Sequence, residues 1–168
     1  MITFIGDHTC RLDSKGRVLL PSAFIKQMMQ PGVGAKDGMQ DRFVVKRDIF
    51  ERCLLLYPMD EWQRQNEILR KNTNPYNREH NAFLRGFFKG IAELSLDNNN
   101  RLLIPKRLLD EIGADREIVM AGQFGKIEIW PRDRYGSIES GDDGFAALAE
   151  KIMGNLQQDA DRKDKGAD

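Results

Sequence analysis

The sequence predicts an α+β fold in which two copies of one unit interleave into a single β-barrel with a pseudo-twofold axis, with linking and C-terminal helices added. Two observations carry this prediction. A pair of sequence blocks occurs twice in the same order, and each copy alone holds too few elements for a core of its own. The 168 residues, 40% hydrophobic and 31% charged, have ordinary globular composition and suit one or two small domains.

The first repeated block surrounds a D-x-x-x-R unit. Residues 12–21 read LDSKGRVLLP and residues 96–105 read LDNNNRLLIP, a shift of 84 positions. The second block reads LLLYPMDEW at residues 54–62 and IEIWPRDRY at residues 127–135, a shift of 73. The matched order argues against chance recurrence. The difference between the shifts predicts an 11-residue insertion in the first copy, which we place at residues 30–41 because that segment is rich in Gly.

Each copy predicts the same series of elements. A short alternating strand leads into Asp13 or Asp97, and a turn follows. Pro21 and Pro105 suit the first turn of a short helix, where the missing N–H costs nothing. The expected ranges are strands 17–20 and 101–104, helices 22–29 and 106–112, and strands 43–46, 53–57, 117–121 and 126–130. A copy of ~45 residues with these few elements can form only a thin core. We therefore expect the two copies to share one core and to close each other's strand edges.

Helices are also expected outside the repeats. The segment between them predicts helices over 60–71 and 77–89, separated by Pro75. Apolar residues at helical spacing predict an amphipathic helix near residues 145–156. The predicted divisions are a first repeat at 7–61, a helical linker at 62–90, a second repeat at 91–134, and a C-terminal helix with an acidic tail at 135–168.

Charge separates the body of the chain from its tail. Acidic and basic residues number 26 each, which excludes a uniformly basic nucleic-acid binder but not a locally basic one. Residues 139–168 carry eight acids and four bases, so the first 138 residues carry a net charge of +4. We interpret the acidic tail as a solvated, frayed end. Competition of the tail with an anionic ligand is the alternative.

No catalytic or metal-binding arrangement stands out, and the protein is predicted not to be an enzyme. The serines lack a nucleophile-elbow setting, the glycines form no phosphate-binding loop, and His8 and His80 lack metal-ligand spacing. Cys10 and Cys53 lie among apolar neighbours and are expected to be buried thiols. No cofactor and no metal are implied. The absence of a signal segment or an apolar run of ~20 residues predicts a cytoplasmic protein.

The repeated D-x-x-x-R unit is the sharpest chemical signal. We favour a structural role for its aspartates, whose carboxylates can accept turn N–H groups. Gly and Asn at the fourth position both tolerate left-handed turn backbone. The predicted turn-structural residues are Asp13, Gly16, Asp97 and Asn100.

Two interpretations compete for Arg17 and Arg101. They can pair with the carboxylates across the turn, or they can present planar donors to phosphate or to a guanine edge. We favour the second, because pseudo-symmetry would present them as a matched pair. Four further basic residues cluster around the two arginines and favour phosphate attraction. They are Arg11 and Lys15 near the first arginine, and Lys106 and Arg107 near the second.

The runs LDSKGRVLLP, CLLLYPMDEW, LDNNNRLLIP and GQFGKIEIW closely resemble the MraZ family of bacterial transcriptional regulators, over roughly residues 1–135. The resemblance implies two AbrB-like, swapped-hairpin units. It also implies a ring-shaped homo-oligomer that binds short direct repeats in promoter DNA and represses the division and cell-wall gene cluster, including its own gene. The family's D-x-x-x-R arginines contact DNA, which implies this role for Arg17 and Arg101. The second motif departs from the pattern, with Asn100 where the first has Gly16.

The implied partners are therefore double-stranded DNA and further copies of the chain, with no membrane, in a cytoplasmic, nucleoid-associated protein. Two other functions stay open at this point. One is an antitoxin-like module that captures a protein through residues 139–168. The other is a structural oligomer whose basic turns make subunit contacts without DNA specificity.

Overall fold

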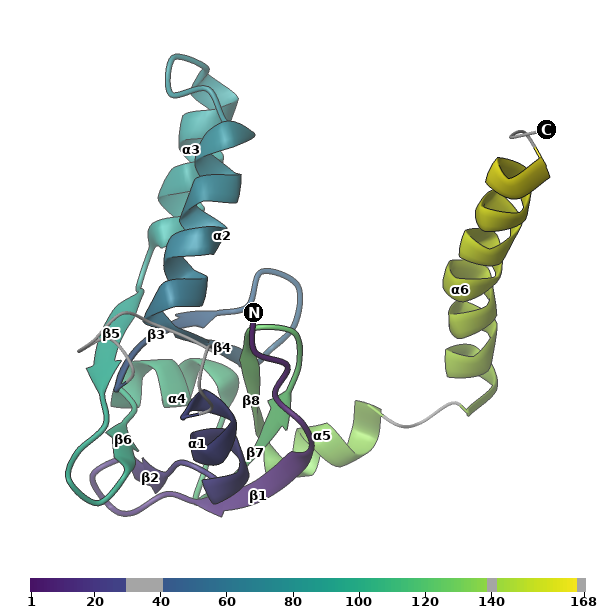
Figure 1. Cartoon of the computed structure of the whole chain (residues 1–168). Coiled ribbons are helices and arrows are strands. Elements are labelled where there is room, and N and C mark those ends of the chain that lie inside the picture. The colour runs from purple at the N-terminus through teal and green to yellow at the C-terminus, as the bar shows by residue number, and fades with distance from the viewer. Residues whose placement is uncertain (30–40, 139–141, 166–168) are drawn as a thin grey trace. The chain divides into compact units, whose positions relative to one another are not determined.

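The two copies form the same five elements in the same order, as the computed structural model shows for residues 1–29, 41–138 and 142–165 (Figure 1). The first copy consists of β1 (Asp7–Arg11), β2 (Arg17–Leu19), α1 (Ser22–Met28), β3 (Arg42–Arg47) and β4 (Leu54–Pro58). The second consists of β5 (Ala92–Ser95), β6 (Arg101–Leu103), α4 (Lys106–Ile112), β7 (Glu117–Gly122) and β8 (Ile127–Pro131). The predicted elements are confirmed, with ends that differ by one or two residues.

The prolines that follow β2 and β6 start the short helices from the N-cap position. Pro21 and Pro105 have extended backbone (ψ 133° and 130°), so helical residues begin immediately after them. The carbonyl of Pro21 accepts hydrogen bonds from the N–H groups of Phe24 and Ile25, and Pro105 does the same in α4. A proline loses nothing there, because the N–H at a helix start has no partner within the helix.

The strands of the two copies alternate within one sheet. The order β1-β7-β8-β4-β3-β5 reads the same when the copies are exchanged, and β2 pairs with β6 in a separate two-stranded ribbon. The first strand of each copy is antiparallel to the third strand of the other, because β1 pairs with β7 and β5 pairs with β3. The structure is therefore α+β with interleaved repeats, as predicted.

The register places the pseudo-twofold axis on two residue pairs. In the ribbon, Val18 lies opposite Leu102, which is its own equivalent in the second copy. Between β4 and β8, Leu55 lies opposite Glu128, again its own equivalent. A residue that faces its own equivalent must lie on the symmetry axis, so the shifts of 84 and 73 both correspond to real structural equivalence.

The structure corrects the placement of the length difference between the copies. Thirteen residues separate α1 from β3, against four between α4 and β7, so this connection accounts for nine residues. Six residues separate β3 from β4, against four between β7 and β8, so the hairpin accounts for the other two. The prediction of one 11-residue insertion is therefore wrong, because β-hairpin loops also tolerate added residues. Residues 30–40 lie outside the described part of the chain.

Both copies contribute to one apolar core against which α1 and α4 pack. Its members come from both copies and from the segment before β1, and their side chains are almost completely removed from solvent. Its largest fully buried members include Phe4, Phe24, Phe43, Leu54, Leu56, Leu102, Ile104, Leu108, Ile112, Ile118 and Met120. Burial of each such side chain stabilises the fold by about 1.5–3 kcal/mol. The shared core is the reason why neither copy needs to fold alone.

The linking helices α2 (Met59–Lys71) and α3 (Arg78–Phe88) form a hairpin whose base meets β3 and β4 and whose tip extends away from the sheet (Figure 1). The Asn77 side chain caps α3 by accepting from two backbone N–H groups. Trp62 on α2 lies in a second apolar cluster and stacks on Phe87 of α3, with ring centroids 6.1 Å apart. The ammonium of Lys46 on β3 lies 4.0 Å from the centre of the Phe87 ring. This cation–π contact joins α3 to the sheet.

Residues Met1–Arg134 group into one compact unit and Tyr135–Asp168 into a second. Helix α5 (Arg132–Ile138) includes the boundary, and α6 spans Asp142–Lys165. The predicted helix near residues 145–156 is confirmed, and it extends over Asp142–Lys165, because Ala, Leu, Lys, Gln and Met are strong helix formers. The expectation of a frayed end therefore does not hold for these residues. No helix among the described residues has both the length and the apolar character needed to cross a membrane.

Candidate nucleic-acid interface

One carboxylate organises the first D-x-x-x-R turn. Oδ1 of Asp13 accepts from the backbone N–H groups of Lys15 and Arg17 at 2.9 Å each, and Oδ2 accepts from Nε of Arg17 at 2.7 Å. The Asp13 N–H donates to the Arg17 carbonyl at 2.9 Å, and the Gly16 N–H donates to the Asp13 carbonyl at 3.1 Å. The backbone N–H of Arg17 makes the largest contribution to lowering the pKa of Asp13, to about 2. The carboxylate is therefore charged at neutral pH.

The second turn repeats this geometry with different residues. Oδ1 of Asp97 accepts from the backbone N–H groups of Asn99 and Arg101 at 2.9 Å each, and Oδ2 accepts from Nε of Arg101 at 2.9 Å. The backbone hydrogen bond from Arg101 is again the main cause that holds the pKa of Asp97 below its ordinary value. Two sequences that differ at all three intervening positions thus form the same turn.

The fourth residue of each turn has left-handed backbone and binds the other copy. The φ angles of Gly16 and Asn100 are +86° and +58°. The carbonyl of Asn100 accepts from the N–H of Leu20 at 2.9 Å. In return, the carbonyl of Gly16 accepts from the N–H of Ile104 at 3.0 Å. The two turns are therefore joined across the pseudo-twofold axis and hold the β2–β6 ribbon between them.

Glycine is needed at the first of these positions. A Cβ on Gly16 would lie 2.9 Å from the carbonyl oxygen of Ile104, a backbone atom that cannot move without shifting the ribbon. We expect Gly16→Ala to lower the free energy of unfolding by about 2–3 kcal/mol, since left-handed strain and this contact both act. Asn100→Gly is the matched control and should change it by less than ~1 kcal/mol. Urea unfolding of both variants measures the difference, and equal losses would contradict this account.

The two arginines combine the two roles that the sequence left in competition. Each uses Nε to bind its aspartate. Among the described residues, no hydrogen bond involves the Nη atoms of Arg17 or Arg101. Their side chains are 35% and 33% exposed. The carboxylate thus fixes the direction of each guanidinium, and the outer N–H groups remain available to a ligand.

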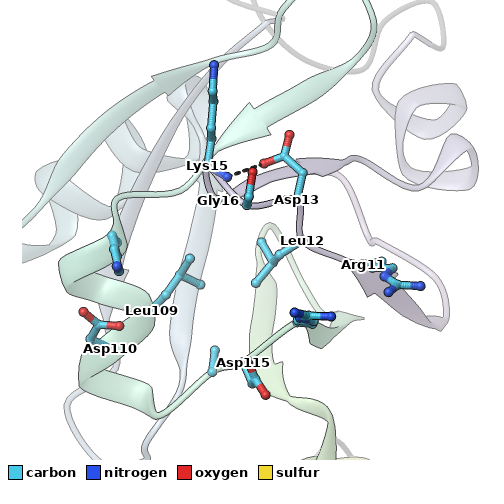
Figure 2. Close-up of a pocket in the computed structure, with 12 residues that line it drawn as sticks. Arg11, Leu12, Asp13, Lys15, Gly16, Leu109, Asp110 and Asp115 are labelled. Atoms are coloured by element: carbon cyan, nitrogen blue, oxygen red, sulfur yellow. Dashed lines mark hydrogen bonds between the residues drawn. The ribbon is translucent and has the colours of Figure 1, made fainter.

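Further charged side chains gather around the first turn. A groove of about 520 Å³ is lined by the charged residues Arg11, Asp13, Lys15, Lys106, Asp110, Asp115 and Arg116. Leu12 and Leu109 face each other across its floor, and the Lys15 side chain extends away from them (Figure 2). Four bases against three acids give this groove an excess positive charge.

The structure changes the expected placement of Lys106. The sequence suggested that it flanks Arg101, but the groove brings it beside residues 13–16 of the first turn. Because β2 and β6 are antiparallel, the residues that follow β6 meet those that precede β2. Sequence analysis also missed Arg116, whose carbonyl accepts from the N–H of Leu12 at 2.8 Å. Only the pairing of β1 with β7 brings Arg116 to this groove.

Arg107 lies apart from this group. Its Nη1 donates to the carbonyl of Gly90 at 2.8 Å, which joins α4 to the connection between α3 and β5. The side chain remains exposed, so it supplies a positive charge at a defined place. It does not line the groove of the first turn.

The histidine and cysteine side chains have roles in packing and hydrogen bonding rather than in a reactive site. Nδ1 of His80 accepts from the backbone N–H of Asn74 at 2.8 Å, and the His8 ring packs edge-on against Phe24. Cys53 is buried, whereas Cys10 is only partly buried, which corrects the expectation for that residue. Burial raises the pKa of the Cys53 thiol to about 12 and that of Cys10 to about 11, so both stay protonated. No group of three metal-binding side chains occurs among the residues that the structure describes.

The fold and its surface define a class of protein with two interleaved α+β repeats that present a matched pair of arginines on one ribbon. The family described as "MraZ protein, putative antitoxin-like" matches residues 3–85 and 87–156. The chain belongs to the MraZ family.

Three relatives named transcriptional regulator MraZ are similar along nearly their whole length. The protein of Christiangramia forsetii is 43% identical over 159 residues, which cover 92% of this chain and 96% of the relative. That of Flavobacterium psychrophilum is 37% identical and covers 95% and 97%. That of Bacteroides fragilis is 33% identical and covers 91% and 92%.

Proposed function

We propose that this chain is a transcriptional regulator that binds double-stranded DNA in a sequence-specific manner through Arg17 and Arg101. The observation that carries the proposal is the pair of partly exposed arginine side chains held in equivalent positions by equivalent carboxylates. A planar guanidinium matches the O6 and N7 acceptors of guanine in the major groove. The names of the relatives support this function.

The β2–β6 ribbon is a suitable element for the major groove. Arg17 lies opposite Leu103, and Arg101 lies opposite Leu19, so all four side chains lie on the same face of the ribbon. Diagonal neighbours on such a ribbon are about 7–8 Å apart. That separation corresponds to about two base-pair steps of 3.4 Å. The major groove admits a two-stranded β-ribbon, so both arginines can reach base edges in the same groove.

Nearby basic residues bind the phosphate backbone in this proposal. Arg11, Lys15 and Lys106 are exposed near the first turn and supply sequence-independent attraction. Arg107, anchored on Gly90, supplies a further fixed charge. The neighbouring acidic residues limit this attraction to phosphate. Weak sequence-independent binding leaves the choice of DNA sequence to the two arginines.

The ribbon also closes the sheet in this proposal, so that the eight strands form one barrel. β1 continues into β2 and β5 into β6 through the two D-x-x-x-R turns. The turns are bridged by hydrogen bonds from the N–H groups of Asp13 and Asp97 to the carbonyls of Arg17 and Arg101. With β2 paired to β6, the ribbon joins the two edge strands of the six-stranded sheet. A closed barrel leaves no strand edge and would hold the arginines rigidly.

In this proposal, several copies of the chain assemble into a ring. The ring acts in the cytoplasm, at the nucleoid. Such a ring would bind direct repeats upstream of the division and cell-wall gene cluster and repress it, together with the protein's own gene. Zero net charge supports assembly, because a single subunit would bind DNA weakly at cellular salt. The α2–α3 hairpin offers exposed apolar side chains for subunit contacts: Ile68, Tyr76, Phe83 and Phe88.

The word antitoxin-like in the family description supports a second candidate, a module that binds a protein partner. Helix α6 would supply the contact, since it exposes an apolar set of side chains: Phe145, Leu148, Ile152, Met153 and Leu156. Affinity capture from host lysate distinguishes the candidates. A toxin held by the native chain and lost from a Phe145→Ser, Leu148→Ser variant would favour the second one.

A mobility-shift assay on DNA upstream of the chain's own gene tests the proposed function. We expect at least about 100-fold tighter binding to this DNA than to a shuffled duplex of equal composition, at a stated salt concentration. A structural oligomer without DNA specificity predicts equal binding to both duplexes. Equal affinities would therefore reject the proposal.

A further inference from the structure

Two large apolar side chains lie in the middle of the polar ribbon face. Leu19 and Leu103 are 59% and 53% exposed. Their strand neighbours Val18 and Leu102 point into the core and are at most 1% exposed. The core therefore does not require leucine at the two outer positions. Apolar residues on such a face cost solubility without stabilising the fold, which suggests an external contact.

The strand register pairs each leucine with the arginine of the other copy. Leu19 lies directly opposite Arg101, and Leu103 lies directly opposite Arg17. Side chains directly opposite each other on antiparallel strands have Cβ atoms about 4.5–5.5 Å apart. A base edge contacted by either arginine is therefore next to a leucine. The two arginine–leucine pairs are related by the pseudo-twofold axis through Val18 and Leu102.

We propose that Leu19 and Leu103 determine specificity by contacting the C5-methyl groups of thymines beside the guanines that the arginines bind. This inference rests on the proposed function and extends it to the recognised sequence. In the major groove, thymine is the base that displays a methyl group, and apolar side chains contact it. Each subunit would thus favour guanine and thymine at neighbouring positions, read by one arginine–leucine pair.

The size of the effect follows from the area of one methyl group. Burying one methylene-sized group contributes enough to change affinity about fourfold. Loss of one thymine methyl should therefore weaken native binding about fourfold at each contacted position. In an assembly the effect multiplies over the subunits that engage the DNA.

The experiment begins with selection of high-affinity duplexes from a random pool by the native chain. Each thymine of the best duplex is then replaced, one at a time, by deoxyuridine, which lacks only the methyl group. We expect the native chain to lose affinity at positions adjacent to a guanine. Leu19→Ala should bind the thymine duplex about as weakly as the native chain binds the uracil duplex, and should not respond to deoxyuridine at the same position. Leu103→Ala should show this insensitivity at a different position.

Phe50→Ala is the matched control, because Phe50 is a large apolar residue, 87% exposed, in the β3–β4 loop. This variant should keep the full response to deoxyuridine. Native mass measurements on all variants distinguish DNA contact from subunit contact. If Leu19→Ala or Leu103→Ala changes the size of the assembly, the leucines are subunit contacts and the inference is wrong.

The remaining outcomes distinguish this inference from the proposed function. If the pool yields no preferred duplex, the proposed function fails, and the inference fails with it. If a preferred duplex appears but native binding ignores every deoxyuridine, the function stands and the leucine contact is rejected. The leucine contact is also rejected if the selected duplex has no thymine beside a guanine. It is rejected again if both leucine variants keep the native response to deoxyuridine.

Discussion

Arg17→Ala is expected to weaken binding to promoter DNA about 100-fold or more and to leave the mass of the assembly unchanged. In the proposed function the variant would lose a bidentate base contact, and each such contact contributes about 1–3 kcal/mol of discrimination. It also leaves the charged carboxylate of Asp13, whose pKa is about 2, without its guanidinium partner at the DNA surface. In an oligomer every subunit loses the contact, so the effects multiply.

The second arginine and a conservative variant refine this prediction. Arg101→Ala should produce a similar loss, because Arg101 is exposed to nearly the same extent as Arg17 and pairs with an equivalent carboxylate, that of Asp97. Arg17→Lys keeps the charge but not the planar donors, so it should keep salt-sensitive binding to any DNA and lose the preference for the promoter. Mobility shifts at two salt concentrations measure both components.

Arg70→Ala is the matched control for these variants. Arg70 also faces an acidic partner on its own helix, Glu67, and its side chain is 83% exposed. Removing it changes the net charge by the same amount at a place remote from the ribbon in sequence. If Arg70→Ala weakens DNA binding as much as Arg17→Ala does, the loss reflects overall charge and the assignment of Arg17 is wrong. Normal binding by Arg17→Ala would also contradict it.

The second large effect concerns the DNA rather than the protein. Two direct repeats at native spacing should bind about 10²–10⁴-fold more tightly than one repeat, because the second contact is made within the same complex. Zero net charge makes this gain necessary. A single subunit places only a few basic residues on the DNA, so salt would weaken its binding strongly. Fluorescence anisotropy on duplexes with one and two repeats measures the ratio.

Spacing supplies the control for this prediction. Inserting five base pairs between the repeats turns the second site by about half a helical turn of 10–10.5 base pairs. Affinity should then fall toward the value for one repeat, while an insertion of ten base pairs should restore part of it. Equal binding to one and two repeats, or indifference to the spacing, would contradict binding by several tethered subunits.

Much of the fold follows from local sequence patterns. Strand alternation, the prolines after β2 and β6 and the recurrence of LDxxxR predicted the elements of both copies, and those with stated ranges end within two residues of the observed bounds. These signals are local, because turns, helix starts and strand periods depend on residues close in sequence. The same patterns placed Asp13 and Asp97 in turns and identified the arginines beside them.

Contacts between the copies could not be deduced in this way. Arg116 reaches the first turn through the pairing of β1 with β7, and Lys106 reaches it because β2 and β6 are antiparallel. The division of the length difference into nine and two residues also depended on strand register. None of these relations leaves a periodic signal in the sequence, because each joins residues that are far apart along the chain.

By itself, then, the sequence determined that two equivalent units exist, which elements each contains and which turn residues carry charge. Only the tertiary structure decided which copy each side chain faces, that Arg17 and Arg101 lie on one ribbon, and that a leucine lies beside each of them. The physical reason is that backbone propensity acts over a few residues. The neighbours of an exposed side chain are instead set by antiparallel pairing, in which a shift of one residue would reverse every side chain.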